Sequence, residues 1–137
     1  MGEVRVQVTI TNAADEVMAR RGKLPLKDVR SYVADAMVDT GAVQTILPAE
    51  VVELLGLATP GHRAVRYADE RSEVVPVTEA IVVEINRRRT SDEGLVLGNE
   101  VLIGQTILEK LDLHVDCANR RVIPNPEHPD QAIVKVK

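Results

Sequence analysis

A single carboxylate follows an apolar run in the segment AMVDTGAVQTILPAEVVELLGL, residues 36–57. The run leads directly into Asp39, and Thr40 and Gly41 complete an Asp-Thr-Gly triplet. The triplet is good turn chemistry and an aspartate often caps a helix, so a purely structural role is one interpretation. The other interpretation is chemical. A carboxylate at the end of a core strand loses solvation unless its neighbours satisfy it, and chains tolerate that more readily at a working site.

A lone carboxylate cannot perform both proton transfers of amide hydrolysis, because one group must accept a proton from water and another must donate one. Two carboxylates about 3 Å apart can do both, since like charges that close cannot both ionise and the pair shares one proton. The chain has one acid in such a setting. A residue near a two-fold axis meets its own copy, so a symmetric homodimer would supply the second Asp39.

The remaining reactive side chains predict no second site. His62, His114 and His128 have no metal-ligand spacing, so we expect no metal and no cofactor. Cys117 lies outside any nucleophile motif and is interpreted as a structural thiol. Asp35 shares a strand face with Asp39, but a separation of about 13 Å along a strand excludes a catalytic pair.

The elements that must position Asp39 are mostly strands. Residues 4–10 alternate apolar and polar side chains, which predicts a half-buried strand, and residues 29–39 predict a second one ending at Asp39. Pro48 suits the first turn of a short helix, with Gly56 as its C-cap. Residues 63–85 predict two strands around a charged tip, and Pro76 within them indicates a sheet edge or a bulge.

The rest of the chain is assigned more coarsely. We expect a short helix over 105–111, a hairpin over 113–124 and a last strand over 132–137. The polar segments 11–28 and 87–94 are expected to be loops, the first as a loop or an irregular hairpin. The tetrapeptide QTIL occurs at 44–47 and at 105–108, each time after an apolar strand and a glycine, which suggests two similar half-domain units.

Composition narrows the class of function. The chain has 137 residues, 45% of them hydrophobic, and a net charge of -4 with both signs mixed along it. No basic stripe supports a nucleic-acid partner. No apolar run is long enough for a membrane span, and the first residues lack a signal-peptide core, so we expect a cytoplasmic protein without a membrane partner. A chain of this length predicts one domain.

The motifs VDTGA at 38–42, LGL after the helix and VLIG at 101–104 resemble those of the retropepsin-like aspartic peptidases, particularly the bacterial single-domain members. The resemblance runs from about Val29 to Pro124. It implies an all-β fold, a closed barrel or sandwich with one or two short helices, that acts as a symmetric homodimer. The domain would span 1–137, with a core of about 3–124 and a C-terminal extension at 125–137.

The resemblance also implies roles for individual residues. Asp39 would be the catalytic acid of each subunit, with Thr40, Gly41 and Ala42 supporting the active-site loop. Thr40 would hydrogen-bond across the dimer, and Gly41 would border the substrate. Ile103 and Gly104 would form the second apolar-glycine motif. The hairpin tip would be a flap over a peptide or protein substrate, with its residues being Tyr67, Asp69, Glu70 and Arg71.

The sequence departs from viral relatives of this family in three places. The expected flap YADERSEV has no glycine, which indicates a stiffer tip. Val43 and Gln105 occupy positions where the viral members often carry an acid and an arginine that pair. Residues after Pro124 are additional. The intact Asp-Thr-Gly triplet favours an aspartic endopeptidase, which we expect. The tip without glycine favours the alternative, a non-catalytic dimeric peptide-binding or scaffold module.

Overall fold

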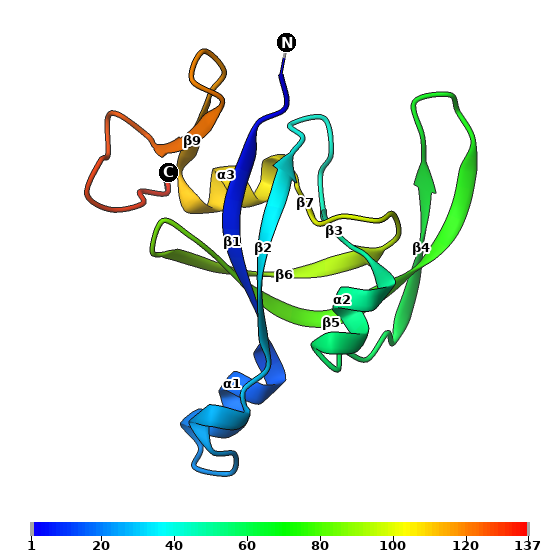
Figure 1. Ribbon diagram of the computed structural model, residues 1–137. Helices are drawn as coiled ribbons and strands as arrows, with labels where there is room; N and C mark the ends of the chain where they lie inside the picture. The colour runs from blue at the N-terminus through cyan, green and yellow to red at the C-terminus, as the bar shows by residue number, and fades with distance from the viewer. Residues whose placement is uncertain (1, 137) are drawn as a thin grey trace.

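A closed barrel dominates the structure, a computed structural model that describes residues 2–136 (Figure 1). Its sheet has the strand order β1-β2-β7-β3-β6-β5-β4, and a further pairing of β1 with β5 closes the sheet into a barrel. The strands of this sheet are β1 (Arg5–Asn12), β2 (Ser31–Val38), β3 (Thr45–Leu47), β4 (Gly61–Arg66), β5 (Ser72–Ile85), β6 (Arg88–Val96) and β7 (Leu102–Ile103). The all-β fold expected from the sequence is confirmed.

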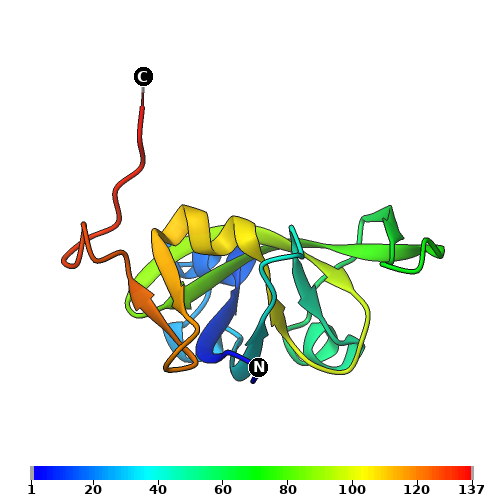
Figure 2. The same cartoon turned by 90° about the horizontal axis from the view of Figure 1, so that it is seen from above.

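Strand β5 belongs to two parts of the molecule. Its second half, from Ile81 to Glu84, pairs with β1 and closes the barrel, while its first half pairs with β4. The pairing with β6 shifts register between Val77 and Ala80, and Pro76 lies directly before that irregularity, as its sequence position predicted. The β4–β5 hairpin therefore extends from the barrel as an arm, which Figure 2 shows from above.

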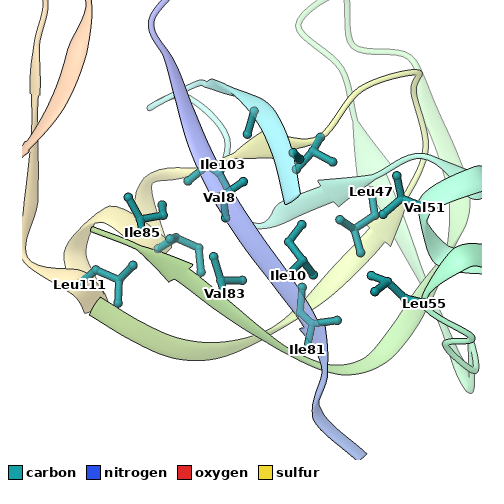
Figure 3. Close-up of a cluster of buried hydrophobic side chains, with 14 of the residues drawn as sticks. Val8, Ile10, Leu47, Val51, Leu55, Ile81, Val83, Ile85, Ile103 and Leu111 are labelled. Atoms are coloured by element: carbon teal, nitrogen blue, oxygen red, sulfur yellow. The ribbon is translucent and has the colours of Figure 1, made fainter. Parts of the chain in front are cut away.

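The barrel interior is filled by aliphatic side chains, because the chain has no Phe and no Trp. Alternate residues of β1 and β5 point inward, among them Val8, Ile10, Ile81 and Val83, each without exposed surface (Figure 3). Burying one such side chain contributes about 1.5–3 kcal/mol relative to exposure. A smaller cluster of Val75, Val77 and Leu95 lies at the base of the β4–β5 arm.

Short helices lie in the connections between strands. They are α1 (Ala13–Arg20), the 3-10 helix η1 (Leu26–Asp28), α2 (Ala49–Leu54) and α3 (Gln105–Leu111). Gly56 adopts a left-handed conformation with φ +61° after α2, as a helix-terminating glycine does. A separate hairpin of β8 (Leu113–Asp116) and β9 (Arg121–Pro124) follows α3 and matches the hairpin expected over 113–124. Within residues 2–136, no helix is long and apolar enough to cross a membrane.

The expected loop over 11–28 is wrong, because residues 13–20 form α1. The buried side chain of Asn12 caps this helix by accepting a hydrogen bond from the Asp15 amide at 3.1 Å, and it donates to the Leu55 carbonyl at 2.8 Å. Asp15 also pairs with Arg30 at 2.8 Å, and the Arg30 guanidinium lowers the pKa of the Asp15 carboxyl. The cap and this ion pair stabilise α1, although the polar composition of the segment had indicated a loop.

The expected loop over 87–94 is also wrong. Asn86 and Arg87 form the turn, both with positive φ, and β6 begins at Arg88. Its side chains alternate between exposed and half-buried, with Arg89, Ser91 and Glu93 exposed. The half-buried Arg88 donates to the Leu111 carbonyl, and Asp92 accepts from the Thr45 hydroxyl, so charge alone indicated a loop where a strand runs.

Two further expectations fail. Residues 132–136 form no strand, so the expected last strand is absent from the described part of the chain. The two QTIL copies also differ, because Thr45–Leu47 is strand β3 whereas Gln105–Leu108 begins helix α3. The tetrapeptide therefore does not mark two similar half-domains.

Candidate active site

The Asp39 loop joins β2 to β3, and β7 lies between these two strands. Strand β7 pairs parallel with β2 through Val38 and Ile103 and antiparallel with β3 through Ile46 and Leu102. The Asp39 amide donates to the Ile103 carbonyl at 2.9 Å, which extends the ladder to the acid itself. Two separate chain segments thus fix where the backbone of Asp39 lies.

Gly104 allows the Asp39 loop to pack against β7. A Cβ atom on Gly104 would lie 2.6 Å from the Ala42 carbonyl oxygen and 3.0 Å from the Val43 carbonyl carbon. The same Ala42 carbonyl accepts a hydrogen bond from the Gln105 amide at 2.8 Å. Only glycine fits at this buried contact without moving one backbone segment, so the structure brings Ile103 and Gly104 directly against the loop.

The Asp39 side chain forms a local turn. Its Oδ1 accepts a hydrogen bond from the Gly41 amide at 2.9 Å, and its carbonyl accepts one from the Ala42 amide at 3.1 Å. Asp39, Thr40 and Gly41 are nonetheless exposed in the single chain, and Thr40 makes no side-chain hydrogen bond within residues 2–136. The desolvation expected at the end of a core strand is therefore not present in the isolated subunit, because the carboxylate opens to solvent.

A cleft of about 740 Å³ separates the Asp39 loop from the β4–β5 arm. Its floor comes from the loop, β3 and the end of β6, and its roof from β4 and the residues that follow it. The residues that line it are Asp39, Gly41, Ala42, Val43, Gln44, Ile46, Arg63, Ala64, Val65, Arg66, Tyr67, Ala68, Leu95 and Leu97. Most of the lining residues are apolar or small, and the Asp39 carboxylate lies at the floor. A cleft of this kind suits an extended peptide.

The four expected flap residues divide into two groups. Tyr67 lines the cleft, whereas Asp69, Glu70 and Arg71 lie beyond it at the exposed hairpin tip. The Arg71 guanidinium bonds the Asp69 carboxylate at 2.7 Å and lies 4.9 Å from the centre of the Tyr67 ring. Hydrogen bonds from Arg71 lower the pKa of the Asp69 carboxyl, and a hydrogen bond to Glu73 raises the pKa of Tyr67.

Sequence reasoning missed the arginines of the cleft. Arg63 and Arg66 line the roof, and neither has the motif context that singled out Asp39. For Arg63 the available signal was its alternation with Val65 along one strand, which places the two side chains on one face.

The other reactive residues lie away from the cleft. Asp35 pairs with Arg5 at 3.0 Å on the outer surface, and Cys117 is free and exposed in the β8–β9 turn. Within residues 2–136 no three metal-binding side chains converge. His128 instead contacts Asp112 at 2.6 Å beside the C-terminal segment.

Comparison with known proteins identifies the fold. No family model matches the chain, and neither does any curated protein sequence. Among solved structures, the retroviral protease-like domain of Ddi1 from Leishmania major superposes with a TM-score of 0.53 at 13% identity, covering 93% of this chain and 98% of that one. A retropepsin-like aspartic protease from Rickettsia conorii gives a TM-score of 0.46 at 18% identity, covering 85% and 89%. The chain thus has a retropepsin-like fold, as its DTG and VLIG motifs predicted.

Proposed function

We propose that the protein is an aspartic endopeptidase that hydrolyses peptide bonds with a water activated by two Asp39 carboxylates, one from each subunit of a symmetric homodimer. The observation that carries the proposal is the position of Asp39. Its backbone is fixed by β7, and its side chain opens onto a cleft with room for an extended peptide.

Only a second subunit can complete such a site. Asp39 is the sole acid among the residues that line the cleft, and hydrolysis requires both an acid and a base. The exposure of Asp39 and Thr40 leaves the loop free to meet its copy across a two-fold axis. In that dimer, Thr40 hydrogen-bonds to the partner loop, while Gly41 and Ala42 border the substrate.

The paired carboxylates share one proton between them. The ionised Asp39 removes a proton from the attacking water, and the protonated Asp39 donates a hydrogen bond to the substrate carbonyl. The resulting tetrahedral intermediate then collapses as a proton passes to the leaving nitrogen. The apolar residues Ile46, Leu95 and Leu97 keep the surroundings of the reacting bond poor in water.

The β4 strand suits the binding of a peptide in an extended conformation. It ends the sheet order, so one edge of its backbone has no strand partner within the described sheet. An extended peptide can pair with such an edge while alternate side chains enter the cleft. Closure of the hairpin over the peptide would involve Tyr67, whose side chain already lines the roof.

Replacing Asp39 with Asn tests the proposal. The change preserves shape and removes both the base and the shared proton, so peptide hydrolysis should fall by about 10²–10⁴-fold or more. Asp35→Asn is the matched control, because Asp35 lies on the preceding strand, outside the cleft, and pairs with Arg5. Wild-type rates for Asp39→Asn would contradict the proposal, as would full activity in a protein that sediments as a strict monomer at micromolar concentration.

The alternative is a non-catalytic dimeric module that binds peptides or serves as a scaffold. It is favoured by the hairpin tip, which contains no glycine and is closed by its own contacts between Asp69, Arg71 and Tyr67. Peptide binding without cleavage, unaffected by Asp39→Asn, would select this alternative.

The proposal treats residues 1–137 as one domain in the cytoplasm, with 125–137 as an extension. Leu113 and Val122 of the β8–β9 hairpin belong to the main hydrophobic core, which supports a domain boundary no earlier than β9. A cytoplasmic location fits a chain whose single cysteine can form no internal disulfide.

A further inference from the structure

We infer that the cleft selects peptides that carry an acidic side chain, and that Arg63 is the residue that selects it. The inference rests on the proposed peptide-binding function of the same cleft, and it concerns which peptides enter rather than how they are cleaved.

The first observation is the charge of the cleft. Among its lining residues Asp39 is the one acid, and Arg63 and Arg66 are the two bases, both on the roof. Within residues 2–136, neither arginine has a carboxylate within the 4.0 Å of an ion pair. Arg71 differs, because Asp69 compensates it at 2.7 Å. The roof of the cleft therefore carries positive charge that the subunit does not neutralise.

The second observation is the direction of Arg63. Along β4, Arg63 and Val65 are two residues apart and therefore lie on the same face of the strand. Val65 packs against the small cluster that contains Leu95, together with Ile46 and Leu97 of the cleft floor. Arg63 thus faces the floor, and its contact with Gln44 confirms that direction. Arg66 also lines the cleft, but it lies three residues further along and has no such contact.

The third observation is that Arg63 is held in place by a neutral group. Its guanidinium donates to Gln44 Oε1 at 2.5 Å, and Gln44 Nε2 donates to the Glu93 carbonyl at 3.2 Å. Gln44 belongs to the chain segment between Asp39 and β3, so Arg63 connects the roof to the catalytic loop. The amide leaves the charge of Arg63 intact and occupies one of its five N–H donors.

A positioned guanidinium with free donors is matched by a carboxylate. The planar donor pair of arginine binds a carboxylate through two parallel hydrogen bonds, and such charged bonds are about twice as strong as neutral ones. A Glu or Asp side chain of the substrate, projecting from a strand beside β4, would supply that group. Arg66, which also lines the cleft, adds attraction without fixing the geometry.

Binding of labelled peptides to the Asp39→Asn protein tests the inference without cleavage. The probes are three apolar peptides that differ at one position, which holds Glu, Gln or Lys, and the readout is fluorescence anisotropy. The Glu peptide should bind about tenfold more tightly than the Gln peptide in 0.05 M salt. The advantage should shrink as salt rises to 0.5 M, where charges at exposed sites are screened.

Variants of Arg63 separate selection by this residue from general charge. In the same Asp39→Asn background, Arg63→Gln should abolish the preference for Glu, and Arg63→Glu should transfer it to the Lys peptide. Arg21→Glu makes the same charge change at an exposed position outside the cleft and should leave the preference unaltered. Circular dichroism of each variant checks the fold, and Arg63→Gln keeps the test decisive if the charge reversal does not fold.

The outcomes distinguish this inference from the proposed function. Equal binding of the three peptides, an unchanged preference in both Arg63 variants, or no binding of any peptide would overturn the role of Arg63. Cleavage of the three peptides by the wild type at equal efficiency would overturn it as well, while supporting the proposed hydrolysis. Selective binding with no wild-type hydrolysis would support the inference and contradict the enzyme.

Discussion

The floor and the roof of the cleft are built differently. The Asp39 loop is fixed by backbone contacts to β7 and by the buried Gly104, beside the main hydrophobic core. The β4–β5 arm extends from the barrel (Figure 2). It has a small cluster of its own at its base and is closed at its tip by exposed side-chain contacts. Backbone packing in a core resists displacement, whereas exposed ion pairs contribute little. The comparison indicates a rigid floor, which holds Asp39, beneath a roof that can adjust.

The largest expected effect on stability comes from filling the space between the loop and β7. Gly104→Ala would place a methyl group 2.6 Å from the Ala42 carbonyl oxygen, so the loop must move. Such overpacking typically costs about 1–3 kcal/mol, and hydrolysis should fall by at least tenfold because Asp39 is displaced. Chemical denaturation and peptide hydrolysis measure the two effects.

Gly61→Ala is the control for this change on the roof side. Gly61 begins β4, has no heavy atom within 4 Å of an added Cβ and does not have positive φ. Its stability and activity should stay near those of the wild type. Comparable losses in the two variants would contradict the view that the floor is the more tightly constrained region.

Two valines of β5 give a matched test within one strand. Val83 belongs to the main core with no exposed surface, and Val77 belongs to the small cluster at the base of the arm. Val83→Ala should lower the free energy of unfolding by about 2 kcal/mol, from lost methyl burial and the cavity left behind. Val77→Ala should cost less globally, because a smaller cluster collapses more readily around a missing group.

Hydrogen exchange sharpens the result. Val77→Ala should accelerate exchange of the β4 amides while leaving the amides of β1 protected, because the arm opens separately from the barrel. Equal loss of protection in both strands would mean that arm and barrel unfold as one unit.

The same division explains what the sequence could predict. The alternation in β1, the acid at the end of β2 and the apolar-glycine motif at Ile103 and Gly104 all have local signatures. The last two belong to the motifs whose resemblance to a known family implied the fold. Gly104 shows why the motif is informative, since only a close backbone contact requires a glycine there.

The failures occurred where long-range contacts override local composition. Helix α1 is supported by the Asp15–Arg30 ion pair and by the hydrogen bond from Asn12 to the Leu55 carbonyl, which join residues 15 and 43 positions apart in the chain. Strand β6 begins at Arg88 within RRRTSDEG, and its polar residues are either exposed, as Arg89 is, or hydrogen-bonded, as Asp92 is to Thr45. Arg63 faces the cleft because β4 lies close enough to Gln44 for the two side chains to form a hydrogen bond. No local sequence pattern predicts this contact.

Acid should break the side-chain contact at the tip of the roof, whereas the backbone contact between the Asp39 loop and Gln105 contains no titrating group. Hydrogen bonds from Arg71 lower the pKa of the Asp69 carboxyl below 3.8, so the Asp69–Arg71 contact is complete above that pH and is lost as pH falls through the lowered value. The Arg71 amide, which donates to Asp69 Oδ1 at 3.0 Å, reports this change by NMR.

The Gln105 amide is the control for the floor, because it donates to the Ala42 carbonyl, which does not titrate. Between pH 6 and 2.5, the Arg71 signal should shift with a midpoint below 3.8, and the Gln105 signal should move little. A midpoint above 3.8 for Arg71 would mean that the tip contact does not favour the ionised carboxyl.

The smallest expected effect on stability is that of Glu70→Gly at the hairpin tip. Glu70 has φ +68°, a conformation that glycine adopts without strain, and its amide donates to the Tyr67 carbonyl at 2.9 Å. Relief of that strain is offset by the greater chain entropy of glycine in the unfolded state, so the free energy of unfolding should change by less than about 1 kcal/mol.

The roof should nonetheless become more mobile, because a glycine releases the tip from a single conformation. The Michaelis constant or the cleavage profile across a peptide library should therefore change, with unfolding measured in parallel. An unchanged cleavage profile would mean that the hairpin is not a flap. If the free energy of unfolding instead fell by several kcal/mol, the tip would be part of the rigid structure, and the contrast between roof and floor would not hold.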